Sequence, residues 1–537
     1  MTDQTPSARL SLGTKIAWGF ADAGVNIFVY LKAVVIFAFM SQYMGVSTSL
    51  SGLVTGLVIL TDMVTDPLIG AWSDRTPSRF GRRRPFMVMG AILMFLFTYL
   101  MFTPPGLVGG AAAAWVFIFY ALASIGFTMV AVPYGAMATE MTPSPQERTV
   151  MMGFRFAFAS VGLLLAGLLA TPGQIASGSL IVWVVIGALM IFPILICVIS
   201  TRRAPRVDRA NQIPFSEQLA IVRANPSFIR HVAAYGVMTV GVAILSAGIL
   251  LVTTNVSIRH VQGGSLDSYF ANQFNFASIE EMHHLGLVAP EGGWVNRRGQ
   301  TIDPLHIQKI NPRKAGWFAQ IDFPALQDSP YGRIQAEAVQ RVLRRAIQAD
   351  VAGPAAGLVG LAGLFPAVFA LFLIGSIFSQ LLWVPLARVM GRGRTLTLGL
   401  SLYGVLACLY LLVLRDANLT LIVYGVFFLG ICNGAYQNLP WAILPTMIDQ
   451  ANTRAQVNVE GVFNGFWLSG QKIANSIGPA VLGYLISLFG YQESTLGFLP
   501  QTAKASGALE VLMTVLPGIF FILAIPLFLT VRADLRR

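Results

Sequence analysis

Long apolar stretches alternate with short polar or glycine- and proline-rich breaks along nearly the whole chain. A helix needs roughly 20 apolar residues to cross a bilayer core about 30 Å thick. This spacing predicts six membrane-spanning helices in the first half, at 13–43, 49–74, 85–103, 111–140, 149–171 and 178–200. It predicts six more in the second half, at 229–256, 355–387, 395–414, 418–447, 459–489 and 511–532. We therefore expect an all-α membrane protein with twelve transmembrane helices.

The composition agrees with a membrane protein. Of 537 residues, 55% are hydrophobic and 11% are charged, against about 25% charged residues in an average soluble domain. The three cysteines, Cys197, Cys408 and Cys432, lie far apart in apolar runs, so they predict neither a disulfide framework nor a zinc site. The formal charge of +12 does not indicate a nucleic-acid partner, because the arginines fall between apolar segments and form no basic face.

Basic residues gather in alternate loops. The loops after the second, sixth and eighth predicted helices are rich in arginine, as is the C-terminal tail, whereas the short loops near 44–49, 104–110 and 172–178 hold no Lys or Arg. Short loops rich in Lys and Arg stay on the cytoplasmic side. We expect a multi-pass protein of the cell membrane, the inner membrane if the source is bacterial, with both termini in the cytoplasm.

Two landmarks recur in both halves of the chain. An arginine-glycine loop precedes the third predicted helix of each half, at Gly81 and at Gly391, and a proline, Pro133 or Pro440, follows 52 or 49 residues later. Repeats in this register predict two six-helix halves, as in the major facilitator fold. We expect a first bundle at 1–200, a cytoplasmic loop at 201–228 and a second bundle at 229–537. An extra-cytoplasmic insertion at 257–352, a small cap or loop, interrupts the second bundle.

The arginine loops predict a gate. Gly70 would let two helices approach closely, and Asp74 would form a charge network with the arginines at the helix ends, which breaks when the halves rock. The full set of predicted gating residues is Gly70, Asp74, Arg75, Gly81, Arg82, Arg83, Arg388 and Arg392.

Asp62 and Asp66 lie four residues apart, on one face of the 49–74 helix and within the hydrocarbon region. An ionisable group there costs about 2.5–3.5 kcal/mol, so the pair must be protonated, paired with a cationic side chain or bound to a cation. Two neighbouring carboxylates suit a site that loads a proton or Na⁺.

The run from Asp62 to Gly70, together with 18–24, Pro133-Tyr134-Gly135 and Lys472, resembles the glycoside-pentoside-hexuronide:cation symporters, relatives of the melibiose permease in the major facilitator superfamily. The resemblance implies that the two aspartates bind the coupling cation and that Arg155 and Lys472 serve substrate binding or coupling. Asn26 and Ala131 stand where the sodium-using pattern has aspartates, which favours H⁺ over Na⁺. Ala131 and Gly135 also depart from the family's sugar contacts, so no galactoside-specific pocket is implied.

Lys32 is an unusual charge inside the first predicted helix. At 1.5 Å per residue it lies roughly 9 Å further out than Asn26, which is level with Asp62. Its long side chain either reaches Asp62 as a built-in counter-charge, making a proton-linked carrier or a uniporter, or lines an aqueous cavity and snorkels outward.

Sugars are bound by paired donors and acceptors and by flat aromatic faces, at the interface between the halves. The candidate substrate-binding residues are Asp22, Asn26, Tyr30, Arg155, Gln437, Asn438, Trp441, Asn464 and Lys472, and the candidate coupling residues are Asp62, Asp66 and Lys32.

These residues predict a secondary transporter that carries a glycoside or other sugar with a cation by alternating access. We expect no enzymatic activity, no metal site and no cofactor beyond the coupling H⁺ or Na⁺. His283 and His284, which follow two glutamates, lack the HExxH spacing of a metal site. The expected partners are a small sugar and the bilayer, with no nucleic acid, for a monomer. One alternative is the same fold carrying a lipid or another organic solute. A more remote alternative is a receptor or enzyme that acts through the insertion.

Overall fold

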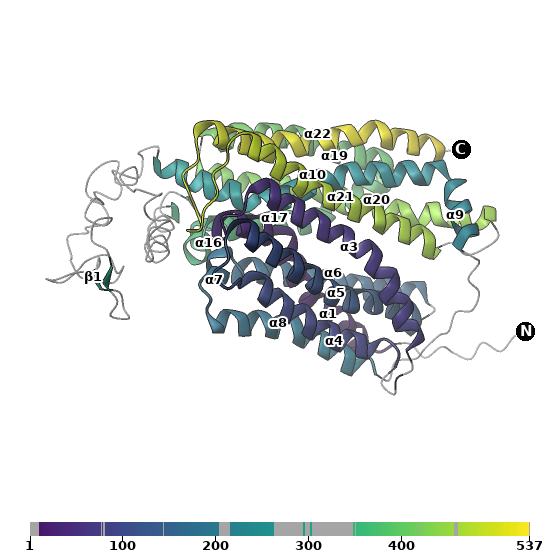
Figure 1. The fold of residues 1–537 in the computed structure, drawn as a ribbon. Coiled ribbons are helices and arrows are strands. Elements are labelled where there is room, and N and C mark those ends of the chain that lie inside the picture. Colours follow the sequence, from purple (N-terminus) through teal and green to yellow (C-terminus); the bar gives the residue numbers. More distant parts are fainter. Residues whose placement is uncertain are drawn as a thin grey trace, which may run out of the picture.

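The computed structural model describes residues 10–76, 78, 81–142, 144–202, 215–262, 294–295, 301–302, 347–348, 351–416, 418–455 and 460–535. Its first half is helical almost throughout (Figure 1). The elements of this half are α1 (Leu12–Tyr30), the π-helix η1 (Leu31–Val35), α2 (Ile36–Tyr43), α3 (Thr48–Arg75), α4 (Arg84–Phe102), α5 (Gly109–Met141), α6 (Pro145–Leu169), α7 (Pro172–Ala176) and α8 (Leu180–Ser200).

The second half has the same character. Its helices are α9 (Phe215–Arg223), α10 (Pro226–Gln262), α16 (Ala355–Ala362), α17 (Leu364–Phe378), α18 (Gln380–Met390), α19 (Arg392–Asp416), α20 (Leu419–Ala455), α21 (Glu460–Leu488) and α22 (Ala503–Leu535). A two-residue antiparallel pair, β1 (Trp294–Val295) with β2 (Thr301–Ile302), is described within the expected insertion. The helix α10 continues to Gln262, past Ser257, where the insertion is expected to begin. His283 and His284 lie outside the described residues.

Eleven helical segments in the described part of the chain are long and apolar enough to cross a membrane. They coincide with eleven of the expected spans, which confirms an all-α membrane fold. The remaining expected span corresponds to α21, a 29-residue helix that packs against α3 and α10 and carries several polar residues, among them Asn464, Gln471 and Lys472. Since α21 is not among the eleven, the count of twelve stays a prediction.

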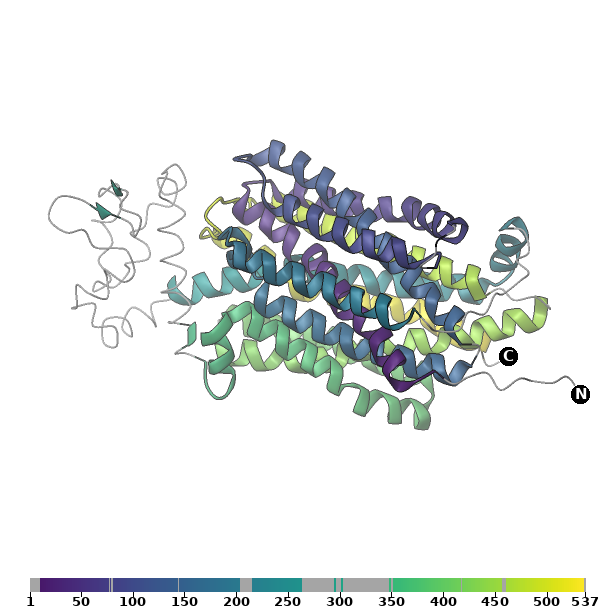
Figure 2. The ribbon, with the colours of Figure 1, turned by 90° about the horizontal axis from the view of Figure 1, so that it is seen from below.

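The long helices run side by side, with the ends of α1 and α22 nearest the termini at one end of the molecule and β1 beyond the other (Figures 1 and 2). In the first half α1 packs against α6 and α8, and α5 packs against α3 and α4. In the second half α22 packs against α10 and α19, and α20 packs against α17 and α19. This packing suits two bundles, whose boundaries at 200 and 229 stay predictions.

The internal repeat has a backbone counterpart. Gly81 and Gly391 both have positive φ, +93° and +81°. Gly81 lies a few residues before α4, and Gly391 comes directly before α19. A residue with a Cβ rarely adopts this conformation, so glycine permits the sharp entry into each helix. The two turns occupy equivalent places in the two halves, as the repeat requires.

The two halves meet closely along α3 and α21. A Cβ on Gly56 would lie 2.7 Å from the carbonyl oxygen of Ser476, and one on Gly52 would collide with the carbonyl oxygen of Pro479. A Cβ on Gly70, in contrast, would meet Val132 at an ordinary 3.5 Å. The expectation that Gly70 permits the close helix approach is therefore wrong. Gly52 and Gly56 have that role.

Polar contacts join the halves at the end opposite the termini. The loop between α21 and α22 bonds to α2 and the residues after it: the amides of Ser494 and Gly497 donate to the carbonyls of Ser41 (2.9 Å) and Gln42 (2.7 Å). The amide of Thr48 donates to Glu493 Oε1 at 3.1 Å. This end of the interface is held shut by hydrogen bonds that must break if it opens.

Candidate functional site: a network of paired charges

Asp62 is buried in α3 with only 2% of its side chain exposed. Its Oδ1 accepts a short hydrogen bond from the Ser124 hydroxyl on α5, and its Oδ2 lies 3.5 Å from Lys32 Nζ. The side chain of Lys32 therefore reaches Asp62, one of the two arrangements that the sequence leaves open. A buried carboxylate is tolerated here because a cationic partner and a hydroxyl both face it.

Lys32 is fixed by its surroundings. It lies in η1, the five-residue π-helix between α1 and α2. Its Nζ sits 4.3 Å from the ring centroid of Phe127 and 5.5 Å from that of Phe28, and its carbonyl oxygen accepts from the Tyr120 hydroxyl at 3.3 Å. Single π-turns inside α-helices are frequent at functional sites, and here the wider turn carries the charged side chain.

Asp66 lies one turn further along α3 and is more accessible, with 31% of its side chain exposed. The Thr128 hydroxyl donates to its Oδ1 at 2.9 Å, and Lys472 Nζ on α21 donates to its Oδ2. Lys472, with 23% of its side chain exposed, comes from the second half of the chain. The Asp66–Lys472 ion pair thus joins the two halves, whereas Asp62–Lys32 lies within the first.

A third ion pair joins α1 to α6. Arg155 Nε lies 3.3 Å from Asp22 Oδ2, and its guanidinium carbon lies 5.0 Å from the ring centroid of Tyr134. Asp22 Oδ1 is buried without a hydrogen-bond partner among the described residues, and the amide of Asn26 donates to the Asp22 carbonyl oxygen at 2.8 Å. Tyr134 is fully buried and Trp18 stacks on its ring at 4.7 Å between centroids, so the guanidinium of Arg155, with 29% of its side chain exposed, is the group here that a polyol can reach.

The second-half candidates are more dispersed. Gln437 accepts from the Ser376 hydroxyl at 3.2 Å, and the amide of Asn438 donates to the carbonyl of Gly434, so it is used within α20. Trp441 is 39% exposed and donates through Nε1 to the Tyr235 hydroxyl at 3.2 Å. Asn464 is half-buried on α21.

Tyr30 is fully buried, its ring centroid 5.3 Å from that of Phe369 on α17. This position places it at the contact between the halves. It packs there against an apolar ring.

Two of the predicted gating arginines pair with an acid outside the predicted set, and their gating role stays a prediction. Arg82 and Arg83 donate to Glu140 Oε1, at 2.6 Å from Arg82 Nη2 and 2.7 Å from Arg83 Nη2, which ties the start of α4 to the end of α5. Partial burial raises the pKa of Glu140, but the hydrogen bonds and charges of Arg83 and Arg82 outweigh it and leave the pKa below its ordinary value. The side chains of Asp74 and Arg75 lie outside what the structure describes.

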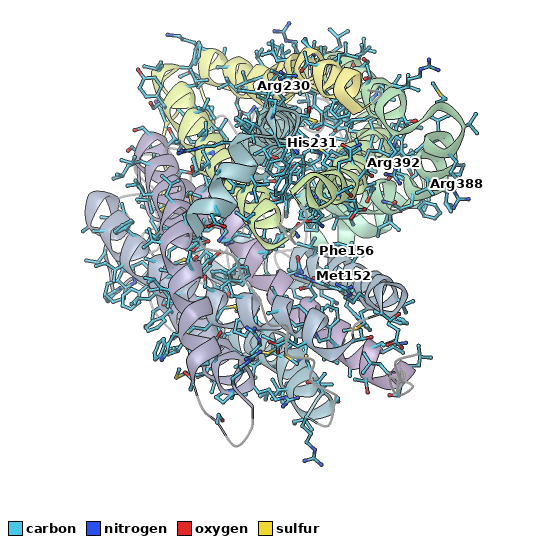
Figure 3. The ribbon with its side chains drawn as sticks, turned by 90° about the vertical axis from the view of Figure 1, so that its right-hand side faces the viewer. Met152, Phe156, Arg230, His231, Arg388 and Arg392 are labelled. Carbon is cyan, nitrogen blue, oxygen red and sulfur yellow. The ribbon has the colours of Figure 1, made fainter. Side chains whose placement is uncertain are left out.

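In the second half, one arginine links the start of α19 to α20. Arg392 Nη1 donates to the carbonyl of Ala442 at 2.8 Å and to the Thr446 hydroxyl at 3.1 Å, both on α20. Arg388 is exposed at the end of α18 (Figure 3). The arginines at the starts of α4 and α19 therefore make equivalent contacts within their own halves.

A model of MFS/sugar transport proteins matches residues 17–260 and 358–536, most of the chain on both sides of the insertion. The chain belongs to this family. The match supports the resemblance to the glycoside-pentoside-hexuronide:cation symporters, and it identifies the protein as a membrane transporter of the major facilitator superfamily, not an enzyme.

Among similar proteins of this family, the symporter YnaJ of Bacillus subtilis (strain 168) is 27% identical over 46% of the chain, and the match spans about half of that relative, 56%. The symporter sll1374 of Synechocystis sp. (strain PCC 6803) is 26% identical over 100% of the chain and 98% of its own length. Both relatives are named uncharacterized symporters.

A similar solved structure is that of a bacterial homologue of the human lysosomal transporter Spinster, in an inward-facing and unoccupied conformation. It is 14% identical, covers 97% of each chain and has a TM-score of 0.51. At this identity the likeness shows the fold alone.

Sequence reasoning about this transporter missed an aromatic cluster in its second half. His231, Tyr235, Tyr436, Trp441 and Trp467 pack together, with Tyr235 stacked on Trp467 at 4.2 Å between ring centroids and on Tyr436 at 5.3 Å. Single aromatic residues in apolar helices usually pack in cores, so of these five only Trp441 is among the candidates drawn from the sequence, and nothing there distinguishes the other four. Trp441 is the exposed member.

Ser124 and Thr128 were also missed, but a signal existed. They are spaced by four residues on α5, as Asp62 and Asp66 are on α3, and the two pairs bond in register. A pair of hydroxyls at the same helical spacing as a pair of intramembrane carboxylates is a pattern that could have been found.

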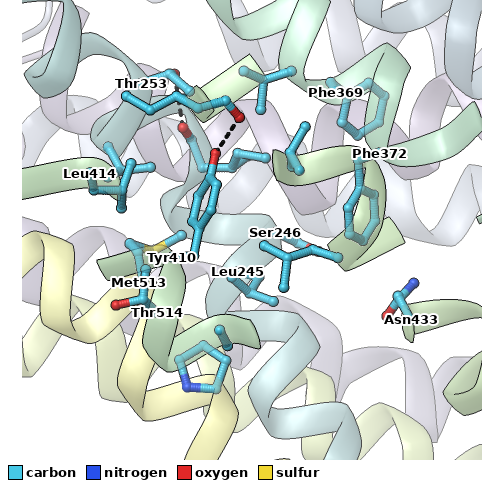
Figure 4. A pocket seen from close by; sticks show the side chains of 18 of the residues that line it. Leu245, Ser246, Thr253, Phe369, Phe372, Tyr410, Leu414, Asn433, Met513 and Thr514 are labelled. Atoms are coloured by element: carbon cyan, nitrogen blue, oxygen red, sulfur yellow. Dashed lines mark hydrogen bonds between the residues drawn. The ribbon is translucent and has the colours of Figure 1, made fainter. Parts of the chain in front are cut away.

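An apolar cavity of about 110 Å³ lies among α10, α17, α19, α20 and α22 of the second half, with Val34 of η1 completing its wall. Its walls include Phe369, Phe372, Tyr410 and Met513, with Ser246, Thr253 and Asn433 among the few polar side chains (Figure 4). Ligand sites usually occupy about 300–1,000 Å³, so this cavity is too small for a sugar or a lipid. It is a packing void of the bundle.

Proposed function

We infer that the protein is a proton-coupled symporter of a sugar or glycoside, and the Asp66–Lys472 ion pair is the observation that carries this inference. The pair links α3 to α21 across the interface between the halves. A proton on Asp66 would cancel its charge and release Lys472, so the protonation state of one carboxylate governs whether the halves are tied together at this point.

The other coupling candidate is already satisfied. Asp62 has 2% of its side chain exposed and faces the tethered ammonium of Lys32, so it does not need an external cation. Asp66, with 31% exposed, is the carboxylate that water and protons reach. This division supports a proton-linked carrier over a uniporter, because one exchangeable acid remains.

The solute site of the proposal lies on α1 and α6. Arg155, with 29% of its side chain exposed, offers a donor fork to the hydroxyls of a sugar ring, and the buried Asp22 holds it in place at 3.3 Å. Concentrating power requires that protonation and solute binding favour each other, a reciprocal coupling free energy. Protonation acts on α3 and solute binding acts on α1 and α6, and the three ion pairs connect these helices.

Alternating access supplies the movement. The end of the interface opposite the termini is closed by backbone hydrogen bonds, whereas Met152 and Phe156 of α6 border the second half in the view from the terminal end (Figure 3), and Phe156, midway along α6, is 66% exposed. We place the terminal end in the cytoplasm, because the arginine-rich loops lie there, and propose that it is the open end. The conformation is then inward-facing.

The proposal is tested with the full-length protein in proteoliposomes. A panel of glycosides and pentoses is added outside while internal pH and internal Na⁺ are recorded with dyes. We expect at least one sugar to acidify the lumen and to accumulate when the outside is more acidic, with no dependence on Na⁺. Sugar uptake without proton movement, or no uptake of any sugar while an amphipathic lipid is moved, would contradict it.

A further inference from the structure

The two carboxylates and the two hydroxyls bonded to them form two pairs, one helical turn apart. On α3, Asp62 and Asp66 are one turn apart, and on α5, Ser124 and Thr128 are one turn apart. Each hydroxyl donates to Oδ1 of the carboxylate opposite it, Ser124 to Asp62 and Thr128 to Asp66 at 2.9 Å. Two carboxylates and two hydroxyls therefore present oxygen ligands along one short strip of the interior.

Carboxylate and hydroxyl oxygens are ligands for small hard cations such as Na⁺ and Li⁺. In this strip, however, both carboxylates already hold an ammonium group through their Oδ2 atoms, Lys32 on Asp62 at 3.5 Å and Lys472 on Asp66. Two negative charges meet two positive ones, so the strip has no net charge with which to attract a free cation.

The two lysines are not equivalent. Lys472 comes from the other half of the chain, has 23% of its side chain exposed and can leave when the halves move apart. Lys32 comes from η1 in the same half as Asp62, has 15% exposed and lies over the rings of Phe127 and Phe28. The contacts of its ammonium all lie in the first half, although η1 itself packs against α10, so a rocking movement does not by itself separate Lys32 from Asp62.

We propose that Lys32 determines ion selectivity: its tethered ammonium occupies the cation position beside Asp62, makes the carrier independent of Na⁺, and conceals a site for Na⁺ or Li⁺ formed by Asp62, Asp66, Ser124 and Thr128. Removing the ammonium leaves one uncompensated negative charge among these oxygens, which only a mobile cation can neutralise without a proton. The transport consequence rests on the proposed function, whereas the binding consequence does not.

Cation binding is measured first, on purified full-length protein, by thermal unfolding in NaCl, LiCl, KCl and choline chloride at equal ionic strength. The test variants are Lys32→Met and Lys32→Gln. We expect Na⁺ and Li⁺ to raise the unfolding midpoint of both variants in a saturable manner, relative to K⁺ and choline, and to leave the wild type unchanged.

Three controls isolate the charge. Lys32→Arg keeps a cation beside Asp62 and should show no Na⁺ response. The double variant Lys32→Met/Asp62→Asn removes both charges and should lose the response. Lys15→Met removes a lysine that pairs with Glu147 at 2.8 Å near the start of α1 and should behave as the wild type.

A wild-type response to Na⁺ equal to that of Lys32→Met would overturn the proposal, and so would a folded Lys32→Met and Lys32→Gln that ignore Na⁺. If folded Lys32→Met and Lys32→Gln can be purified only in sodium-containing buffer, that result would support the proposal. Failure of both variants to fold even in Na⁺, when the double variant folds, would count against it, because Na⁺ would then not replace the ammonium.

The transport arm uses the solute found in the sugar panel. An inward Na⁺ gradient should stimulate uptake by Lys32→Met about tenfold and leave wild-type uptake unchanged. If no sugar is transported by the wild type but the Na⁺-dependent stabilisation of Lys32→Met is found, the proposed function fails while the role of Lys32 in ion selectivity stands.

Discussion

Asp62 and Asp66 lie one helical turn apart, yet their surroundings give them different chemistry. Asp62 is almost completely buried and faces Lys32 from its own half, whereas Asp66 is partly exposed and faces Lys472 from the other half. The sequence predicts that the two carboxylates share a helix face. It cannot rank them, because their difference comes from which helix supplies each lysine.

Asp66→Asn should uncouple the carrier. The neutral amide mimics a permanently protonated carboxylate, so solute exchange should persist while accumulation against a gradient falls by at least tenfold, about 1.4 kcal/mol of lost coupling. Counterflow and pH-driven uptake of the same sugar in proteoliposomes measure the two activities. Undiminished uphill uptake would show that the coupling acid lies elsewhere.

At the scale of elements, the π-helix η1 accounts for the largest gap between sequence and structure. A straight α-helix rises 1.5 Å per residue, and on that geometry the reach of Lys32 to Asp62 stays undecided. The five residues of η1 widen the helix locally and present Lys32 to α3. No sequence periodicity predicts a π-turn, because the apolar residues around Lys32 fit an ordinary helix equally well.

The contact between α3 and α21 depends on the missing side chain at Gly56. Gly56→Leu would place a Cβ 2.7 Å from a backbone carbonyl oxygen of Ser476, which cannot swing away. Overpacking of this kind costs about 1–3 kcal/mol, so the unfolding midpoint and the uptake rate should both fall. Gly70→Ala, whose Cβ would meet Val132 at 3.5 Å, should keep the midpoint of the wild type. Equal midpoints for the two variants would contradict the tight contact.

The bridge from Arg82 and Arg83 to Glu140 predicts a pH-dependent difference. The folded protein lowers the pKa of Glu140 below its ordinary value of 4.5. The ionised carboxylate therefore stabilises the fold at pH values above 4.5, and this stabilisation is lost as the pH falls through the lowered pKa. Glu140→Gln should therefore lower the free energy of unfolding at pH 7 by about 1 kcal/mol. This is less than charged hydrogen bonds usually contribute, because Arg82 is 40% exposed and solvent screens its charge.

Thermal unfolding of the wild type and Glu140→Gln between pH 7 and pH 4 measures this difference. The two midpoints should converge toward the acid end of the range. A constant gap across the range would mean that the charge on Glu140 contributes nothing.

At the scale of the whole molecule, the sequence predicts the order of spans, the repeat and the common end of the termini well, since each depends on long-range patterns of apolar residues, glycines and arginines. It does not predict how the closed end is sealed. The amides of Ser494 and Gly497 bond to carbonyls near α2, and backbone groups carry no residue-specific signal. The polar 489–502 loop looks like any other loop in the sequence.

The asymmetry between the two ends predicts different thiol reactivity. In a Cys408→Ser background, which removes the exposed native cysteine, Phe156→Cys should react with a water-soluble maleimide at least tenfold faster than Ser41→Cys. Phe156, midway along α6, is 66% exposed, whereas Ser41 is fully buried at the closed end. Saturating sugar at acidic pH should reduce this ratio, and equal initial rates would rule out an inward-facing resting state.

The pairing of Asp62 and Asp66 each with its own lysine has an electrical consequence. In the empty carrier Asp62, Asp66, Lys32 and Lys472 sum to zero, whereas one added proton leaves the loaded carrier with a single positive charge. The membrane voltage would then act on the loaded crossing only, at about 2.3 kcal/mol per 100 mV. The return of the empty carrier would be electrically silent, and an interior-negative potential would draw solute inward even without a pH difference.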